Sequence, residues 1–480
     1  MLDSNRDSQH GVSLQHEVSL QRGGSGNFGA NEFRAGTVPT FPNGGYGWVC
    51  TAASAMINTH TWGINSSYGV LLAHYLSKEY FAGATPLEYA FIGSLSISCA
   101  LMVSPVATAL TREIGARPTM LCGVVIHTAG LILASLATRV LHLFFTQGIL
   151  FGLGMGLLFS PAAAIVPQWF STHRSLATSI SASGSGLGGL IYSVASGAMI
   201  QKLGVPWTLR VLGIVAFVVN TLCACLVKDC SSAIGSTQLA FDTRLLRRPE
   251  FLLLLGFSWF SMLAYVILIF SLSNYATWIG LDPSKAALIS ALFNLGQGLG
   301  RPVIGYFSDQ TGRLNMSILM TLLAALLSLA VWIPAKTYPV LIFFSVACGP
   351  VAGTFWATIG AVTAEVAGIQ QVPTALNLVW LSIALPSLFS EPIALQIVSG
   401  TGSYLGTQLF TGFMFLAAVA CLLVVHGWKV NMPADTTREF EQPVQEECLD
   451  EQSIHIGVAV HQAKLDAGAA ILSCLRWEKV

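Results

Sequence analysis

Twelve stretches of about 20 mostly apolar residues follow one another between residues 46 and 427. Each is long enough to cross the roughly 30 Å hydrocarbon core of a bilayer as a helix. In the whole chain 53% of residues are hydrophobic and 10% are charged, so too few charges exist to solvate an ordinary globular surface. We therefore expect an all-α integral membrane protein. The expected spans are residues 46–72, 87–110, 118–138, 141–164, 173–199, 207–227, 251–275, 284–307, 315–334, 339–362, 372–398 and 405–427.

Lysine and arginine residues are distributed unevenly over the connections between the spans. About 16 lie in the two ends of the chain and the even-numbered loops, and about five lie in the odd-numbered loops. The positive-inside rule therefore predicts that both termini are cytoplasmic.

The polar segments predict how the chain is organised. Residues 1–42 and the acidic tail lack an apolar period and are expected to be disordered. Residues 454–480 become apolar again without reaching a spanning length, and their role stays open. The expected organisation is a cytoplasmic arm at 1–42, six-helix halves at 43–227 and 251–428, a cytoplasmic linker at 228–250 and a cytoplasmic tail at 429–480.

Two copies of one motif predict that the two halves are homologous. Residues 104–116 align without gaps to residues 301–313, an offset of 197, and Gly115 pairs with Gly312. A repeat at this scale in an apolar chain is typical of secondary transporters, in which the substrate site lies between the halves near the membrane midplane.

A positive charge, Arg301, lies inside the expected eighth span. Arginine at the bilayer centre costs at least about 2.5 kcal/mol and normally faces a bundle interior or an aqueous cavity. The alternative is a position near the interface, to which the side chain snorkels. Gln297 and Asn294 share its helix face, and Asn65 and Ser66 belong to a polar run in the first span. We expect these residues to bind an anionic substrate.

Further charges lie at the helix ends and in the eleventh span. Arg112, Asp309 and Arg313 can pair between the halves and so gate one face of the protein, or can simply set topology. Glu391 is a second intramembrane charge. It could carry a proton or pair with a cation, or lie close enough to the outer interface to be solvated.

Signals for catalysis, metals and cofactors are missing. The ten cysteines have no CxxC spacing, and the chain contains no HExxH motif, no GxSxG motif and no paired carboxylates. We expect no cofactor, no metal site and no enzymatic activity. The zero net charge gives no reason to expect a nucleic-acid partner.

Three motifs carry a resemblance to a known family. Gly305-x-x-x-Asp309-Gln310-x-Gly312-Arg313 resembles the signature loop of the major facilitator superfamily, which has two pseudo-symmetric six-helix halves. Two more resemble the first-span and fifth-span motifs of its monocarboxylate porter family, and the short linker is similar to that of the fungal branch. They are Pro42-Asn-Gly-Gly-Tyr-Gly-Trp48 and Val166-Pro-Gln-Trp-Phe-Ser-Thr-His-Arg-Ser-Leu-Ala-Thr-Ser-Ile-Ser-Ala-Ser-Gly184.

The resemblance implies that Arg301, which is followed by Pro302 as in the family, engages the substrate carboxylate. This sequence also departs from the family. The acidic residue one turn earlier is Gln297 here, the first-span lysine of the animal lactate carriers falls on Ser66, and the first-motif aspartate is Asn43. Because of these departures, lactate–proton symport is in doubt, and a larger organic acid or a fungal secondary metabolite becomes a candidate substrate.

Two functions are consistent with these observations. The first is a secondary active transporter of a small, monocarboxylate-like organic anion, working by alternating access in the plasma membrane, with proton coupling left open. The alternative is an efflux carrier for a fungal secondary metabolite, with a bulkier and more aromatic cavity. The aromatic candidates for this bulkier cavity are Trp62, Tyr275, Trp356 and Trp380.

A function of another kind is a non-transporting sensor of the same fold, which would carry a longer cytoplasmic domain.

Overall fold

The computed structural model describes residues 44–77, 81, 83–229 and 242–431. This part of the chain is helical and contains no strand. The helices are α1 (Tyr46–His60), α2 (Trp62–Ser66), α3 (Tyr68–Ser77), α4 (Pro86–Met102), α5 (Ser104–Ile114), α6 (Ala116–Ala134), α7 (Val140–Leu143), η1 (Phe144–Leu150), α8 (Phe151–Ile165), η2 (Val166–Trp169), α9 (Arg174–Leu226), η3 (Leu245–Arg247), α11 (Pro249–Trp278), α12 (Pro283–Thr311), α13 (Arg313–Leu326), η4 (Leu327–Trp332), α14 (Tyr338–Ala352), α15 (Thr354–Ala367), η5 (Ile369–Gln371), α16 (Val372–Thr401) and α17 (Leu405–Val430).

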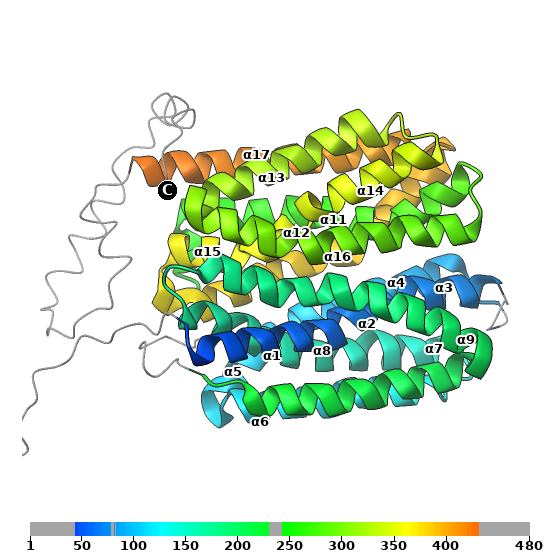
Figure 1. The fold of residues 1–480 in the computed structure, drawn as a ribbon, viewed down its shortest axis with the longest axis horizontal. Coiled ribbons are helices and arrows are strands. Elements are labelled where there is room, and N and C mark those ends of the chain that lie inside the picture. The colour runs from blue at the N-terminus through cyan, green and yellow to red at the C-terminus, as the bar shows by residue number, and fades with distance from the viewer. Residues whose placement is uncertain (1–43, 78–80, 82, 230–241, 432–480) are drawn as a thin grey trace, which may run out of the picture. The chain divides into compact units, whose positions relative to one another are not determined.

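The described helices run along one common direction (Figure 1). Counted from their bounds, with α9 folding back at Gly204, they make twelve passes in the described residues. Eight helical segments are long and apolar enough to cross a membrane, and the number is nine if α4 and α5, bent by 41°, form one span. One of these segments, α9, makes two passes. The remaining passes are α1 to α3, which break at Thr61 and Ser67, and α12, which contains Arg301.

The outward-facing side chains of the passes include many large apolar residues. Val194, Leu299 and Phe343 are examples, with 66%, 61% and 60% of their surface exposed. Extensive apolar exposure of this kind marks a surface that is covered by something other than water. Together with the spanning helices, it indicates a belt that faces lipid.

Glycines in the left-handed region of the backbone make three of the reversals between passes. Gly204 has φ +77° inside α9, and the helix folds back on itself there (Figure 1). Gly115, between α5 and α6, and Gly312, between α12 and α13, have φ +93° and +100°. Such angles are costly for residues with a Cβ atom. These last two glycines are the pair aligned by the sequence repeat, so both halves reverse with the same kind of turn.

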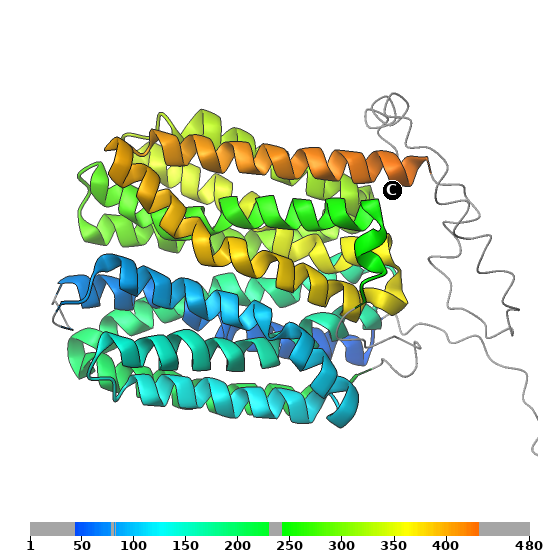
Figure 2. The same cartoon turned by 180° about the vertical axis from the view of Figure 1, so that it is seen from behind.

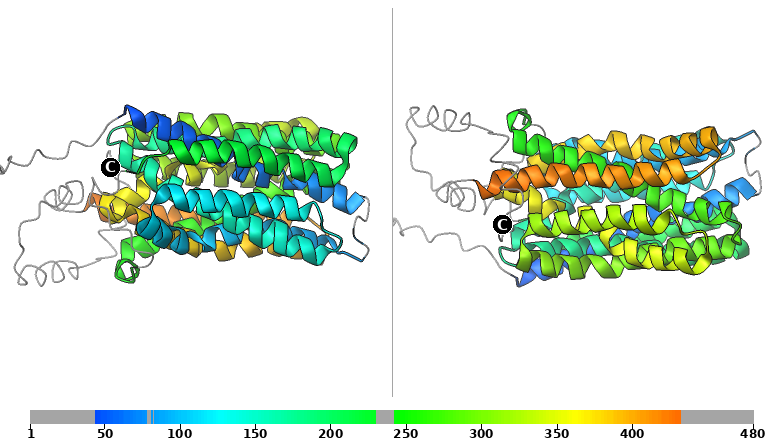
Figure 3. Two further views of the ribbon diagram at one scale, coloured as in Figure 1. Left: turned by 90° about the horizontal axis from the view of Figure 1, so that it is seen from below. Right: turned by 90° about the horizontal axis from the view of Figure 1, so that it is seen from above.

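The passes form two six-helix groups. Helices α1 to α9 form the first half, coloured blue to green, and α11 to α17 form the second half, coloured green to orange (Figure 1). Seen from behind, α16 runs beside α4 (Figure 2). The views from below and above show that the helix axes of each half are nearly parallel (Figure 3). The expected fold class, two pseudo-symmetric six-helix halves, is confirmed.

Small residues bring the helix backbones close together, both within and between the halves. A Cβ atom on Gly186 in α9 would lie 2.6 Å from the backbone nitrogen of Gly298 in α12. Within the first half, a Cβ atom on Gly63 would lie 2.7 Å from the Cα atom of Gly188. Close backbone contact at small residues is how membrane helices pack without a hydrophobic driving force.

Helix α1 begins and α9 and α17 end at the same end of the bundle, which we call the terminal face (Figure 1). The expectations for the arm at 1–42, for the acidic tail and for residues 454–480 lie outside the described residues, as does the part of the linker at 230–241.

Replacing Gly63 by alanine is expected to destabilise the first half by about 1–3 kcal/mol, because the new methyl group would press on the backbone of Gly188. Thermal unfolding in detergent measures the effect. The matched control is Gly197→Ala, since the nearest atom to a Cβ there is a Val70 methyl carbon at 3.9 Å. Equal melting temperatures for the two variants would contradict the close-packing argument.

Candidate functional site

A cavity, which we call the central cavity, lies between the two halves and is lined by helices from both. Its volume is about 80 Å³, which is room for a small molecule and more than one water needs. Apolar side chains dominate its wall, with a few polar groups among them, as in most small-molecule sites. The polar lining residues are Asn58, Asn65, Ser66, Thr178, Ser181, Ser185, Tyr265 and Arg301.

Arg301 lies near the middle of α12 and is only 2% exposed, so the alternative that it snorkels to an interface is wrong. Its Nη1 donates to the carbonyl oxygen of Ala182 at 2.6 Å and to Oγ of Ser185. Its Nη2 donates to the hydroxyl of Tyr265 at 3.1 Å and to Oε1 of Gln297. No carboxylate of the described residues lies within ion-pair distance of this guanidinium.

A glycine in the second half makes space for the guanidinium. Gly353, between α14 and α15, packs against Arg301, and a Cβ atom at this position would lie 2.9 Å from Nε. This Nε is buried and has no hydrogen-bond partner in the described part of the chain. A buried charge with one donor unpaired and the others bonded to neutral acceptors is costly, which makes the side chain a natural partner for an anion.

The four amide and hydroxyl residues predicted to accompany Arg301 occupy different places. Gln297 is 1% exposed and bonds to Arg301, whereas Asn65 and Ser66 line the central cavity directly. Asn65 also accepts a hydrogen bond from Ser96 at 2.6 Å. Asn294 donates to the Ser290 carbonyl on its own helix and is absent from the cavity lining. It packs against Gly189 of α9 instead.

Aromatic rings form much of the cavity wall. Trp356 stacks on Trp380 with ring centroids 5.7 Å apart and lies 5.2 Å from Trp62. All three of these predicted aromatic residues line the cavity. The fourth, Tyr275, lies outside it, because its hydroxyl bonds to the Ala335 carbonyl at 3.0 Å. The wall therefore suits a substrate with an apolar or aromatic body.

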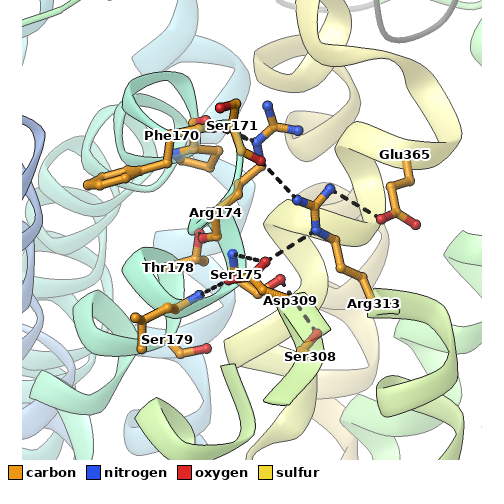
Figure 4. Close-up of polar contacts among 12 residues, drawn as sticks. Phe170, Ser171, Arg174, Ser175, Thr178, Ser179, Ser308, Asp309, Arg313 and Glu365 are labelled. Atoms are coloured by element: carbon orange, nitrogen blue, oxygen red, sulfur yellow. Dashed lines mark hydrogen bonds and ion pairs between the residues drawn. The ribbon is translucent and has the colours of Figure 1, made fainter. Parts of the chain in front are cut away.

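Asp309 closes the seam between the halves at the terminal face (Figure 4). Its Oδ1 accepts the backbone N–H of Ser175 at 3.0 Å, and its Oδ2 accepts that of Leu176 at 2.9 Å. These N–H groups belong to the first turn of α9, which has no side-chain cap from its own N-cap residue His173. A carboxylate at a helix N-terminus is favoured by the free N–H groups and by the helix dipole. We call this contact the latch.

Arg313 extends the latch into a charge network (Figure 4). Its Nε lies 3.5 Å from Oδ1 of Asp309, its Nη1 lies 3.2 Å from Oε1 of Glu365, and its Nη2 donates to the Ser171 carbonyl at 3.3 Å. Lys429 completes the network, 2.9 Å from the other oxygen of Glu365.

Arg112, the first-half residue predicted to take part in gating, lies elsewhere. It pairs with its neighbour Glu113, and the two side chains are 52% and 64% exposed. The Asp309 and Arg313 side chains are 8% and 16% exposed. Exposed ion pairs contribute little because water and salt screen them. The structure therefore brings Asp309 and Arg313 together at the seam but not Arg112.

Glu391 is buried in α16 with 3% of its surface exposed, so the alternative of a solvated interfacial position is wrong. Both of its carboxylate oxygens lie within hydrogen-bond distance of the Ser271 hydroxyl, at 3.0 and 2.9 Å. It does not line the central cavity. Glu391 and Arg301 are therefore separate sites in this conformation.

A profile of the family described as Major Facilitator Superfamily matches residues 48–278 and 253–463. The chain belongs to the major facilitator superfamily. The Probable transporter MCH2 of Saccharomyces cerevisiae is 32% identical over 432 residues, which are 88% of this chain and 90% of that protein.

Two other relatives differ in the cargo that their names state. The Fujikurins efflux protein of Gibberella fujikuroi is 29% identical over 360 residues, covering 73% of this chain and 76% of that one. Monocarboxylate transporter 12 of Mus musculus is 26% identical over 415 residues, covering 78% and 84%. The relatives support the monocarboxylate-transporter-like branch of the superfamily.

A solved structure shows the same fold. The Escherichia coli fucose:proton symporter FucP matches with a TM-score of 0.61 and 13% identity, over 79% of this chain and 98% of that one. The family and the spanning helices identify a multi-pass membrane protein and a secondary transporter. The relatives named above are transporters, not enzymes.

Several residues of this transporter site were not expected from the sequence. They are Tyr265 and Ser185 beside Arg301, and Glu365 with the N–H groups of Ser175 and Leu176 at the latch. The sequence did not identify the serines and the tyrosine, because they have no distinctive spacing in their apolar helices. It did not identify the backbone N–H groups either, because their one sequence signal is the start of a helix. Among the described residues no three His, Cys, Asp or Glu side chains are grouped to hold a metal ion.

Proposed function

We propose that the protein carries a small organic anion of the monocarboxylate type, bound through Arg301, by alternating access. The observation that carries this proposal is a buried guanidinium on the central cavity that meets no carboxylate of the described residues. A substrate carboxylate would supply the missing counter-charge through charge-assisted, bidentate hydrogen bonds. Asn65 and Ser66 offer further polar contacts from the other half.

The aromatic wall supports a second candidate, export of a fungal secondary metabolite. Trp62, Trp356 and Trp380 give a flat, apolar surface suited to a bulkier body. The relative named as an efflux protein favours this candidate too. The two candidates share the cavity and differ in how much of the binding depends on a carboxylate.

Opening and closing of the terminal face is assigned to the latch. Asp309 and Arg313 belong to the second half and bond to residues of the first half. Opening must break these contacts, so their strength sets the balance between the two faces. By the positive-inside rule the terminal face is the cytoplasmic one, and the plasma membrane is the expected location.

Proton coupling, where it occurs, is assigned to Glu391 in α16. Glu391 is the intramembrane carboxylate that could carry a proton, and Ser271 is its bonded partner. Arg301 has the neutral amide of Gln297 beside it instead of an acid. Coupling of anion transport to protons is therefore tested in the same experiment as anion transport itself.

The test is counter-flow in proteoliposomes with labelled acetate, lactate, pyruvate, benzoate and a bulkier aromatic acid. Saturable exchange of at least one small carboxylate is expected. If none of the small acids is exchanged and only the bulkier compound is, the efflux candidate would replace the proposal. A second arm imposes an inward proton gradient and compares Glu391→Gln with the unchanged protein. If the gradient raises the transport rate of the unchanged protein but not that of the variant, Glu391 is identified as the proton carrier.

Replacing Tyr265 by phenylalanine is expected to raise the KM for the carboxylate about fivefold, as the loss of one net hydrogen bond of about 1 kcal/mol predicts. The hydroxyl accepts from Arg301 and donates to Gln297 at 2.6 Å, so it orients the guanidinium. Initial rates in proteoliposomes measure the change. The matched control is Tyr192→Phe, whose ring packs on His60 outside the cavity and whose KM should not change.

A further inference from the structure

Three arginines lie together at the start of the second half. Arg244 precedes the single turn of η3, Arg247 ends that turn, and Arg248 is the N-cap residue of α11. The Arg247 N–H donates to the Arg244 carbonyl at 3.1 Å, and side chains three residues apart lie on the same side of such a 3₁₀ turn. Arg244 and Arg247 are exposed, and Arg248 is half-buried. We call these three residues the arginine cluster.

Leucines hold the arginine cluster in place. Leu245 is 1% exposed and belongs to the apolar core, and Leu246 packs against that core. With its leucines packed inward, the turn keeps the guanidinium groups of Arg244 and Arg247 near each other on the outside of the bundle. Two like charges at short range repel each other. The arrangement therefore favours an anion that can neutralise both.

The arginine cluster has no acidic partner among the described residues. The ion pairs of this part of the chain include none of its members. The carboxylate of Asp242 accepts the backbone N–H of Arg244 at 2.9 Å, and Glu250 is buried. Cations are also unfavourable near the N-terminus of a helix, here that of α11, because of the helix dipole. An external anion would relieve both costs.

Other cations at the terminal face differ in this respect. Arg313 and Lys429 both lie within ion-pair distance of Glu365. Lys228 lies 4.1 Å over the ring of Tyr46. The arginine cluster therefore differs from these three cations in having no such partner in the described part of the chain.

The arginine cluster lies where the lipid-facing surface of α11 begins. η3 and the start of α11 are at the terminal face and project from the side of the bundle (Figure 3). Leu252 is 49% exposed and Trp259 is 36% exposed, with the half-buried Leu255 between them. Residues at this spacing share one face of a helix. An apolar stripe therefore runs along α11 from the arginine cluster towards the membrane centre.

We propose that the arginine cluster binds the headgroup of an anionic phospholipid, whose acyl chain lies along the apolar stripe of α11. Guanidinium groups bind phosphate oxygens through charge-assisted, often bidentate hydrogen bonds. A lipid matches both the charge and the stripe, whereas a soluble anion matches only the charge. The orientation proposed above puts the cluster in the cytoplasmic leaflet, which carries the anionic lipids. The site is separate from the central cavity and does not depend on which anion is transported.

The experiment measures lipid binding to the full chain in a neutral detergent by native mass spectrometry. The protein is titrated with dioleoyl phosphatidylcholine, dioleoyl phosphatidylserine or dioleoyl phosphatidylinositol 4-phosphate. Each anionic lipid is expected to bind at least about tenfold more tightly than phosphatidylcholine, which corresponds to about 1.4 kcal/mol. The difference should shrink as the salt concentration rises. Equal dissociation constants for the three lipids would overturn the inference.

A charge-matched pair of variants tests whether the arginine cluster causes the preference. Arg244→Gln combined with Arg247→Gln should bring the anionic lipids within about threefold of phosphatidylcholine. The control combines Arg112→Gln with Arg139→Gln, which also removes two exposed arginines, and should keep the tenfold preference. A preference retained in the first variant would place the lipid elsewhere and overturn the inference. If that variant folds poorly, Arg247→Gln alone should weaken binding of the anionic lipids several-fold.

A soluble headgroup distinguishes a lipid from a free phosphate. Glycerophosphoinositol 4-phosphate has the same charged group as the lipid but no acyl chains. It is expected to displace phosphatidylinositol 4-phosphate only at concentrations at least about tenfold above those of the lipid, because it gains nothing from the apolar stripe. Displacement at equal concentration would indicate a site for a soluble phosphate and overturn the assignment to a lipid.

Discussion

Replacing Arg301 by glutamine is expected to reduce transport of the organic anion at least about hundredfold, with normal amounts of folded protein. Glutamine keeps one hydrogen-bond donor group but has no charge, and a carboxylate buried beside a neutral amide loses its counter-charge. Removing one partner of a buried charge pair typically costs about 2–5 kcal/mol, and each 1.4 kcal/mol is a factor of ten in affinity. Initial rates over a range of substrate concentrations in proteoliposomes measure the loss.

A second arginine gives a matched control. Arg210 on the second pass of α9 bonds to Ser135 at 3.1 Å and lies 4.9 Å over the ring of Trp207, all within the first half and away from the cavity. Arg210→Gln should transport normally. Arg301→Lys keeps the charge without the planar fork and should fall between the two glutamine variants. Unchanged kinetics in Arg301→Gln would remove Arg301 from the substrate site.

The fold could be predicted from the sequence because its determinants are local. Spanning length and hydropathy locate each pass, and the repeat around Gly115 and Gly312 predicts the relation between the halves. The structure adds a reason for the repeat, since both glycines adopt φ angles that other residues avoid. The break of the first pass at Thr61 and Ser67 was not predicted, because neither residue is a strong helix breaker.

The site was predictable only where a charge stands out against an apolar helix. Arg301 and Glu391 were noticed for that reason, and both are buried as the cost of a lipid-facing charge requires. Asn294 was expected on the same grounds as Gln297, by its spacing from Arg301. Spacing specifies a helix face but not which helix covers it, and α9 covers Asn294. Tyr275 was misplaced for the same reason, since its hydroxyl meets the Ala335 carbonyl near α13 and η4.

The latch shows how the two copies of the repeat have diverged. The residue 197 positions before Asp309 is Arg112, and the residues 197 positions after Ser175 and Leu176 are Val372 and Pro373. The first copy thus lacks the acceptor, because it has Arg112 in place of the acid, and Pro373 in the second half has no N–H to donate. A hydrogen bond from Thr108 to Asn377, at 2.9 Å, connects α5 and α16 instead. Sequence comparison of the copies could have shown the loss of the acid but not what replaced the contact.

Because Arg112 of the first copy cannot make a second latch with the start of α16, Asp309→Asn is expected to shift the protein strongly towards opening at the terminal face. Asparagine keeps one acceptor oxygen and loses the charge that faces the N-terminus of α9 and Arg313. Hydrogen bonds to a charged group are worth about 1.5–3 kcal/mol each. Loss of one of them should change the ratio of open to closed protein about tenfold to a hundredfold.

The measurement is the distance between spin labels at Pro118 and Thr311, exposed positions at the terminal face on opposite halves, in a background without native cysteines. Asp309→Asn should populate longer distances between the two labels, which are rare in the protein that retains Asp309. The control Glu113→Gln removes the acid of the exposed pair with Arg112, which screening makes weak, and should leave the distribution unchanged. The same distribution in all three proteins would mean that the seam is held closed by packing of α9 on α12, and that Asp309 only caps the helix it meets.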